Sequence, residues 1–281
     1  MPEHAYNDFA SPMYPLGHSQ DEFARLALQA NLYADVTREV LNRAGIKRGM
    51  KVVDLGSGIG DVSLLAAKLV GPRGRVLGLD KSATAVGVAK ARAIAEGLNN
   101  CNFEARDIET ADVPTSSDLV VGRLILAYLS NAEDVVRRIV GSLKMGAVVA
   151  FQEINLGDYA MSPGLPLHDG CLRWIRQAFK ESGLCAESGT RLLELLKRSG
   201  VVNAAAVHTA RVETWDDAVA PDYFSETVRS MLPIITGLGI ASTAEIGIDS
   251  LAARLRKELE ENQGTIILPG LVSAWGYAPG L

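Results

Sequence analysis

The chain has 281 residues, 48% of them hydrophobic, and its 28 Lys and Arg against 33 Asp and Glu give a formal net charge of -5 at pH 7. This length suits one α/β core with added helices and is short for two independent cores. Because acids and bases are interspersed and no basic block occurs, nucleic acid is excluded as an expected partner.

The sequence carries no evident targeting or metal-binding signal. Its amino terminus has no basic segment followed by an apolar core, and no apolar stretch approaches the length of a membrane span, so we expect a cytoplasmic protein without a membrane partner. Cys101, Cys171 and Cys185 are widely spaced and form no C-x-x-C pair. We therefore expect reduced thiols and no metal site.

Strand-like and helix-like stretches alternate through most of the chain. The expected strands lie at 51–55, 75–79, 101–105, 118–123 and 146–153, and the helices between them at 60–70, 82–97 and 131–143. This alternation predicts a parallel sheet with right-handed crossovers. Beyond it we expect a helix at 189–199, a long strand at 201–213 and, in TIILPGLVSAWGYA near the end, the last strand pair of a hairpin.

Three helical additions, at 20–46, 168–183 and 222–262, stand outside this alternation. The second follows the strand that ends at Glu153, and the third interrupts the terminal hairpin. Open α/β sheets bind ligands at the carboxyl ends of their strands. We therefore expect these helices to form a lid over the ligand site.

The sequence VVDLGSGIG, at 52–60, predicts a buried strand that opens into a tight loop, with a helix from about Asp61. Gly56, Gly58 and Gly60 allow backbone to approach a ligand closely. Dinucleotide folds carry a glycine at the position of Asp61, and a carboxylate there suits an ammonium or sulfonium better than a phosphate. The structural alternative for Asp61 is an ordinary acid in the first turn of a helix.

A second apolar run, VLGLD at 76–80, ends in an acid at about the twenty-residue spacing of a ribose-binding carboxylate. Together with EARDIE and DLVVGRLILAYL, these motifs form an ordered series. The series resembles the class I S-adenosylmethionine-dependent methyltransferases over about residues 47–155, and is closest to the small-molecule branch similar to ubiquinone and menaquinone biosynthesis methyltransferases.

The resemblance implies an α/β fold, with a Rossmann-like seven-stranded, mostly parallel sheet, an antiparallel last strand and a helical lid. It implies S-adenosylmethionine as cofactor and S-adenosylhomocysteine as product. The corresponding division of the chain is a lid segment at 1–46, a cofactor-binding core at 47–155, lid insertions at 156–186 and 214–263, a core continuation at 187–213 and a terminal core strand at 264–281.

By resemblance, the first cofactor contacts fall in the loops after the first two strands. Asp54 is expected to engage the methionine ammonium, directly or through water, and its alternative is to accept N–H groups of the loop. Ser57 belongs to the same loop and is also explained by turn geometry. Asp80 is expected to accept both ribose hydroxyls rather than only cap a helix. Lys81 covers the adenine edge, unless it is solvated surface.

Further contacts are expected after the third and fourth strands. Asp107 and Ile108 resemble the family's adenine-recognition turn, in which an acid accepts from the exocyclic amine and an apolar side chain packs on the ring; the alternative is a surface acid. Gly122, Arg123 and Leu124 are expected to contact the amino-acid portion of the donor through main-chain atoms. Because Arg123 interrupts an apolar run, we expect it to be paired or to lie at the strand end.

The amino-terminal segment YPLGHSQDEFARLALQA resembles a segment that folds over the donor in related enzymes. Its polar candidates are Tyr14, His18, Arg25 and Gln29. The alternative is an amphipathic helix with a solvated face, and both interpretations stay open for Arg25. Exchange of such helices between copies is compatible with a homodimer.

Aromatic side chains provide the candidates for an acceptor pocket. The expected substrate-binding residues are Tyr128, Trp174, Tyr223 and Phe224, with Phe179 and Met231 as further candidates. Residues of these types at helical spacing also form the core of a lid.

Together these features predict a cytoplasmic enzyme of secondary metabolism that methylates a small, largely apolar metabolite on oxygen, nitrogen or carbon. In-line displacement of this kind mainly requires alignment and the exclusion of water. A hydroxyl acceptor would need a base, for which His18 and His168 are the candidates and Glu153 and Asp158 are further choices. Either histidine is equally explained as a surface residue. The alternative is an S-adenosylmethionine-binding cyclase or isomerase that does not turn the donor over.

Overall fold

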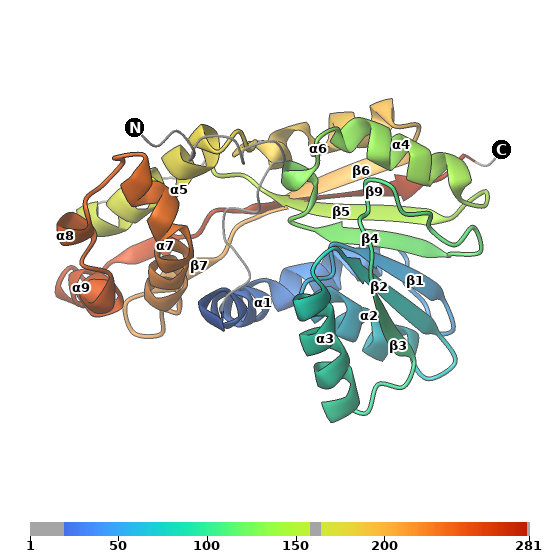
Figure 1. The fold of residues 1–281 in the computed structure, drawn as a ribbon, viewed down its shortest axis with the longest axis horizontal. Coiled ribbons are helices and arrows are strands. Elements are labelled where there is room, and N and C mark those ends of the chain that lie inside the picture. Colours follow the sequence, from blue (N-terminus) through green and yellow to red (C-terminus); the bar gives the residue numbers. More distant parts are fainter. Residues whose placement is uncertain (1–19, 158–163, 280–281) are drawn as a thin grey trace, which may run out of the picture.

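The computed structural model describes residues 20–157 and 164–279, which form a large central sheet, a small second sheet and helices around them (Figure 1). The strands are β1 (Lys51–Leu55), β2 (Arg75–Asp80), β3 (Cys101–Ala105), β4 (Leu119–Arg123), β5 (Val148–Ile154), β6 (Val202–Thr209), β7 (Val212–Thr214), β8 (Thr265–Ile267) and β9 (Leu271–Tyr277). The helices are α1 (Gln20–Arg43), α2 (Asp61–Val70), α3 (Ala83–Ala95), the 3-10 turn η1 (Leu126–Tyr128), α4 (Ala132–Ser142), α5 (Pro166–Glu181), α6 (Ser188–Arg198), α7 (Ala220–Gly237), α8 (Thr243–Ile246) and α9 (Ile248–Glu261).

The central sheet has seven strands in the order β3-β2-β1-β4-β5-β9-β6. β1 pairs in parallel with β2 and β4, and β4 with β5, whereas β9 runs antiparallel between β5 and β6. The predicted seven-stranded, mostly parallel sheet with an antiparallel last strand is therefore confirmed. Because β1 has β2 on one side and β4 on the other, the crevice at their carboxyl ends is the usual ligand position for an open α/β sheet.

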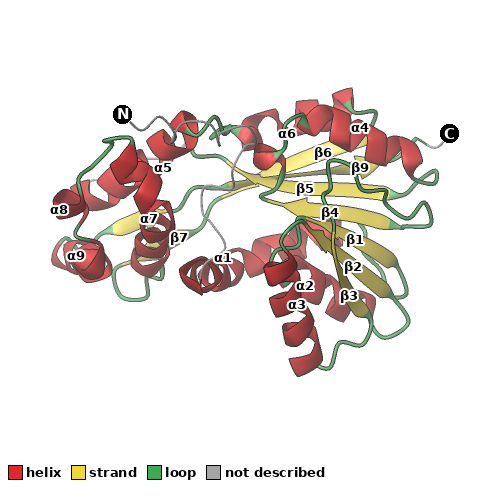
Figure 2. Ribbon diagram, in the orientation of Figure 1, coloured by secondary structure: helices red, strands yellow, loops and turns green. Residues whose placement is uncertain are grey.

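Helices cover both faces of the central sheet, α2 and α3 on one face and α4 and α6 on the other (Figure 2). Alternate side chains of β1 reach two separate cores: Val52 packs in the cluster with α2 and α3, and Val53 in the cluster with α4 and α6. A strand that is buried on both faces needs apolar residues at successive positions, which explains the nearly continuous apolar run around them.

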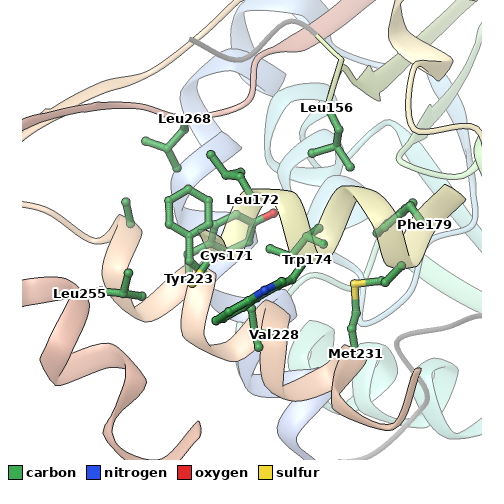
Figure 3. Packing of buried hydrophobic residues seen from close by; sticks show 14 of the residues in the cluster. Leu156, Cys171, Leu172, Trp174, Phe179, Tyr223, Val228, Met231, Leu255 and Leu268 are labelled. Atoms are coloured by element: carbon green, nitrogen blue, oxygen red, sulfur yellow. The ribbon is translucent and has the colours of Figure 1, made fainter. Parts of the chain in front are cut away.

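A separate helical body lies at one end of the sheet and is here called the cap; it consists of α5, α7, α8 and α9 with β7 and β8 (Figure 1). The chain enters the cap after β5 and again after β6, and it returns at β9. Ile154, Thr209 and Leu271 stand at these three points and are neighbours in the register. Figure 3 shows the apolar core of the cap, with Trp174 of α5 near Val228 of α7.

Helix α1 joins the sheet layer to the cap, because it packs against both α2 and α7. Leu41, near its end, belongs to the core under the sheet, whereas Leu32 and Tyr33 belong to the core of the cap. No helix in the described part of the chain is long and apolar enough to cross a membrane.

Two expectations for the carboxyl-terminal strands are wrong. The predicted long strand at 201–213 is divided, since β6 lies in the central sheet and β7 pairs with β8 in the cap. The predicted strand pair near the end does not form: β8 and β9 lie in different sheets. Pro269 and Gly270 separate them, and proline has no N–H to continue a ladder. A Cβ at Gly270 would lie 2.1 Å from the ring Nε2 of His208.

Gly60 has a structural role that the sequence does not separate from ligand binding. It precedes α2 with a φ of 92°, and a Cβ there would lie 2.9 Å from the Phe103 ring and 3.1 Å from Ala89. We predict that Gly60→Ala lowers the free energy of unfolding by about 1 to 3 kcal/mol, from overpacking and left-handed backbone strain. Urea denaturation measures the change.

Gly87→Ala is the matched control, because this position lies inside α3 and its Cβ would meet no atom within 4 Å. There the change should raise the free energy of unfolding by about 0.5 to 1 kcal/mol through helix propensity. Equal stability of the two variants would contradict the packing role of Gly60.

Candidate functional site

A cavity of about 210 Å³, here called the strand-end cavity, lies at the carboxyl ends of β1, β2, β3 and β4. Its walls are the loops after these strands and one face of α1. The predicted cofactor residues that line it are Arg25, Gln29, Gly56, Gly58, Asp80, Lys81, Asp107, Ile108, Arg123 and Leu124. The fold therefore brings together ten residues from segments that lie far apart in the sequence.

The glycine loop after β1 exposes its backbone to this cavity. Gly56 and Gly58 line it with φ angles of 66° and 51°, and a Cβ at Gly58 would meet no atom within 4 Å. A ligand can therefore approach this backbone closely. Ser57, between them, is buried, and its hydroxyl has no hydrogen-bond partner among the described residues.

Asp80, the last residue of β2, holds this loop in place. Its Oδ2 accepts from the Gly58 N–H at 2.8 Å, and its Oδ1 accepts from the Ser82 N–H at 2.8 Å at the start of α3. Each carboxylate oxygen has two lone pairs, so each can accept a further hydrogen bond from a ligand in the cavity. Loop support and ligand binding are thus compatible roles for this residue.

Asp54 is buried beneath the glycine loop and does not line the strand-end cavity. Its Oδ2 accepts from the Ser63 hydroxyl of α2 at 2.5 Å. Burial raises the pKa of this carboxyl from its ordinary value of 3.8 to about 7, while the Ser63 hydrogen bond opposes the rise. The structure therefore does not support direct contact of Asp54 with a ligand; it joins β1 to α2.

Asp61 does not line the strand-end cavity, contrary to its expected role facing a cationic ligand. Its Oδ1 lies 2.7 Å from Arg92 Nη1, and its Oδ2 lies 3.9 Å from Arg123 Nη2. Arg123 ends β4 with its side chain only 7% exposed, so it is paired at the strand end as expected. Burial lowers the pKa of the Arg123 guanidinium, an effect that Asp61 and Asp54 oppose.

The turn after β3 forms another wall of the strand-end cavity. Ile108 is buried there and Asp107 lies beside it. Arg138 of α4 holds this turn by donating to the carbonyls of Ile108 at 2.8 Å and Ala111 at 2.6 Å. The sequence analysis missed Arg138, because its partners are main-chain oxygens that leave no signal in a side-chain pattern.

A second cavity of about 50 Å³, here called the cap cavity, lies beside the first. Arg25, Gln29, Leu124 and Tyr128 line both cavities. The remaining walls are mainly apolar and come from the cap and from the end of β5; they include Glu153, Leu172, Ile175, Phe179, Tyr223 and Phe224. Three of the four predicted acceptor residues, Tyr128, Tyr223 and Phe224, therefore lie at one cavity.

Helix α1 places a buried ion pair at the junction of the cavities. Arg25 donates through Nε and Nη2 to the two carboxylate oxygens of Glu22, each at 2.7 Å, and through Nη1 to Gln29 Oε1 at 2.7 Å. Arg25 is therefore buried and does not belong to a solvated helix face, which was the alternative interpretation of this residue. The sequence analysis missed Glu22, although its spacing of three residues from Arg25 places both on one helix face.

The structure does not bring His168 to either cavity. It lies within the first turns of α5, and its Nδ1 is 2.9 Å from Glu258 Oε2. Burial lowers the pKa of this imidazole against the opposing effect of Glu258. The residue belongs to the interior of the cap.

Several other candidates lie elsewhere. Trp174 and Met231 pack in the cap core, as Figure 3 shows, and line neither cavity. Gly122 faces Phe151, whose ring would lie 2.7 Å from a Cβ at that position, and it too lines neither cavity. Tyr14, His18 and Asp158 lie outside the described residues. Within residues 20–157 and 164–279, no group of three His, Cys, Asp or Glu could hold a metal ion.

Comparison with known families decides the class of this site. A family model described as a methyltransferase domain matches residues 46–200, which is more than half of the chain. The chain belongs to this family. Its fold and family are those of the class I S-adenosylmethionine-dependent methyltransferases, whose cofactor is S-adenosylmethionine.

Two curated relatives of the chain illustrate the similarity. Aklanonic acid methyltransferase DauC of Streptomyces sp. strain C5 is 29% identical over 134 residues, covering 47% of this chain and 60% of the relative. The ubiquinone/menaquinone biosynthesis C-methyltransferase UbiE of Pseudomonas fluorescens strain SBW25 is 30% identical over 120 residues, covering 42% and 47%. The chain therefore spans about half the length of the curated relatives it matches.

Among solved structures, the chain resembles phosphoethanolamine N-methyltransferase 2 of Haemonchus contortus in complex with phosphomonomethylethanolamine and S-adenosylhomocysteine. The TM-score is 0.54 at 19% sequence identity, and the match covers 87% of this chain and 52% of that one. This likeness supports the fold.

The buried Asp54 generates a prediction for the dependence of stability on pH. Because its pKa is raised to about 7, the folded protein retains a proton that the unfolded chain releases near pH 4, so stability falls as pH rises between these values. Asp54→Asn should remove up to about 1.4 kcal/mol of this fall per pH unit. Urea denaturation at pH 5 and pH 8 measures it.

Asp35→Asn is the control, because Asp35 is exposed on α1. That variant should keep the pH dependence of the wild type. If Asp54→Asn keeps it as well, the assignment of a buried, late-ionising Asp54 is wrong.

Proposed function

We propose that the protein transfers the methyl group of S-adenosylmethionine to a small, largely apolar metabolite. One observation carries the proposal: the strand-end cavity, which bears the carboxylates of Asp80 and Asp107, adjoins the mainly apolar cap cavity, and Leu124 and Tyr128 line both. A donor in the first cavity and an acceptor in the second would lie next to each other at these shared residues. Binding in adjoining cavities aligns the reactants and limits the access of water.

The donor is assigned to the strand-end cavity, whose residues fit it. The two oxygens of Asp80 each keep a lone pair for a ribose hydroxyl. Asp107 offers a carboxylate to an exocyclic amine, and the buried Ile108 offers an apolar surface to the ring. The open space at Gly58 suits a close approach of the amino-acid portion to the backbone, whereas the buried Ser57 hydroxyl lines neither cavity.

The acceptor is assigned to the cap cavity. Aromatic side chains of Tyr128, Phe179, Tyr223 and Phe224 stand around it, and the Tyr128 and Phe179 rings are 6.5 Å apart. This lining favours a compact apolar or aromatic molecule. One curated relative is named an aklanonic acid methyltransferase, which supports a small-molecule acceptor. A cytoplasmic place in secondary metabolism remains part of the proposal.

When bound, S-adenosylmethionine supplies a methyl group on a positively charged sulfur. The residues of this chain position the two reactants around it. Leu124, with an unusual φ of 55°, turns the chain after β4 between the cavities. The Arg25–Glu22 pair and Gln29 close the junction from the side of α1.

The donor site is tested by titration calorimetry with S-adenosylhomocysteine. Asp80→Ala should weaken binding by about 1 to 3 kcal/mol, because ribose hydroxyls lose their acceptor and the glycine loop loses its anchor. Asp217→Ala, an exposed acid of the cap, is the control and should bind like the wild type. A folded wild type that binds neither S-adenosylmethionine nor S-adenosylhomocysteine would refute the proposal.

Turnover separates methyl transfer from the cyclase or isomerase alternative. With S-adenosylmethionine labelled on its methyl group, a labelled product should form together with one S-adenosylhomocysteine per turnover. Product formation without consumption of the donor would favour the alternative.

A further inference from the structure

A buried carboxylate stands at the wall of the cap cavity, where the acceptor is assigned. Glu153 is the penultimate residue of β5, is 1% exposed and lines the cap cavity. Its Oε1 accepts from the N–H groups of Ile125 at 2.9 Å and Leu126 at 2.7 Å, and its Oε2 accepts from the Ser188 hydroxyl at 3.1 Å.

These bonds fix the carboxyl group without using all of its capacity. Two carboxylate oxygens have about four lone-pair sites, and of these hydrogen bonds Oε2 accepts only the one from Ser188, which leaves it a site for a proton. Among the described residues, Glu153 forms no salt bridge, in contrast to Glu22 in the same neighbourhood. A buried charge without a counter-ion is costly, so this group readily takes up a proton.

The acid–base range of the group agrees with this geometry. Burial raises the pKa of Glu153 from 4.5 to about 7, and the N–H groups of Leu126 and Ile125 and the Ser188 hydroxyl oppose the rise. A base with a pKa close to the working pH is deprotonated in a large fraction of molecules and is still basic enough to take a proton from the substrate. The other titratable groups of this cavity are Arg25, which is paired, and Tyr128 and Tyr223.

We propose that Glu153 is the general base of the methyl transfer and that the acceptor is a phenol or an enol whose O–H faces this carboxylate. The inference rests on the proposed function. It names a substrate class for the cap cavity and a second role for a residue that also holds the η1 turn.

The step balances as follows in atoms and electrons. The acceptor O–H gives its proton to Glu153, and its electron pair, on oxygen or on the conjugated carbon of an enol, forms the new bond to the methyl carbon. The bond between that carbon and sulfur breaks, and its electrons stay on sulfur, so that S-adenosylhomocysteine leaves neutral. Glu153 then loses the proton to solvent.

Electrostatics favours this acceptor class over an amine. The donor brings a positive sulfur to the junction that Leu124 and Tyr128 line. In a cavity of low dielectric, an acceptor that becomes an anion is attracted to that charge, whereas an ammonium is repelled. The aromatic walls at Phe179 and Phe224 suit the planar skeleton of a phenol or conjugated enol.

The test uses labelled S-adenosylmethionine and a panel of phenols and enolisable 1,3-dicarbonyl compounds, each paired with an amine of the same skeleton. We expect methylation of phenol or enol members and not of their amine partners. Glu153→Gln should lower kcat by at least about 100-fold with little change in KM, since the amide can keep the hydrogen bonds to η1 and Ser188 but takes no proton. Glu194→Gln, an exposed acid of α6, is the control.

The pH profile of kcat provides a readout that a structural role would not change. The wild type should lose activity as pH falls through about 7. Ser188→Ala removes a hydrogen bond that lowers the pKa of Glu153, so this acidic limb should move to higher pH. An unmoved limb, or full kcat in Glu153→Gln, would overturn the role as base.

Binding of S-adenosylhomocysteine distinguishes the two proposals. If the wild type and Glu153→Gln both bind it, and the wild type methylates the amines or no member of the panel, the acceptor class is overturned while the donor site stands. If the folded wild type does not bind it, the proposed function itself fails.

Discussion

The site depends on backbone N–H groups that leave the ladder where parallel strands end. Such groups need acceptors when they are buried. Asp80 supplies one for the glycine loop after β1, and Glu153 supplies two for the turn after β4. Each carboxylate comes from the strand beside the loop that it holds, since β2 pairs with β1 and β5 pairs with β4. The order of the strands therefore decides which carboxylate holds which loop at the walls of the two cavities.

Helix α1 packs against both the central sheet layer and the cap, and its residues line both cavities. Its Tyr33 packs in the cap core and donates to the Pro269 carbonyl at 3.3 Å, next to the start of β9, while Leu41 packs under the sheet. Between these contacts it places the Arg25–Glu22 pair at the junction of the cavities. The buried arginines at this end of the sheet thus face carboxylates, as the cost of burying a lone charge requires.

Most of the lining of the strand-end cavity was predictable, because these positions follow the ends of strands. A glycine-rich turn and an acid after a second apolar run place Gly58 and Asp80 at the same edge of a parallel sheet. In the structure the Gly58 N–H donates to Asp80 Oδ2 at 2.8 Å. Within those motifs the individual roles were not predictable. Gly58 opens to the cavity while Gly60 packs on Phe103, and Asp54 points to Ser63, because the direction of each group depends on the packing of α2.

The sequence by itself determined the positions of the five parallel strands, β1 to β5, and the sheet edge at which the loops after them gather, because apolar periodicity and turn residues act over a few neighbouring residues. Only the tertiary structure decided what lies above that edge. Residues of one amphipathic cap share the same pattern whether they face the cavity, as Phe224 does, or the interior, as Trp174 and His168 do. Two further features depend on contacts between residues far apart in the chain. They are the pairing of β7 with β8 in a second sheet and the hydrogen bond of Glu153 to the η1 turn.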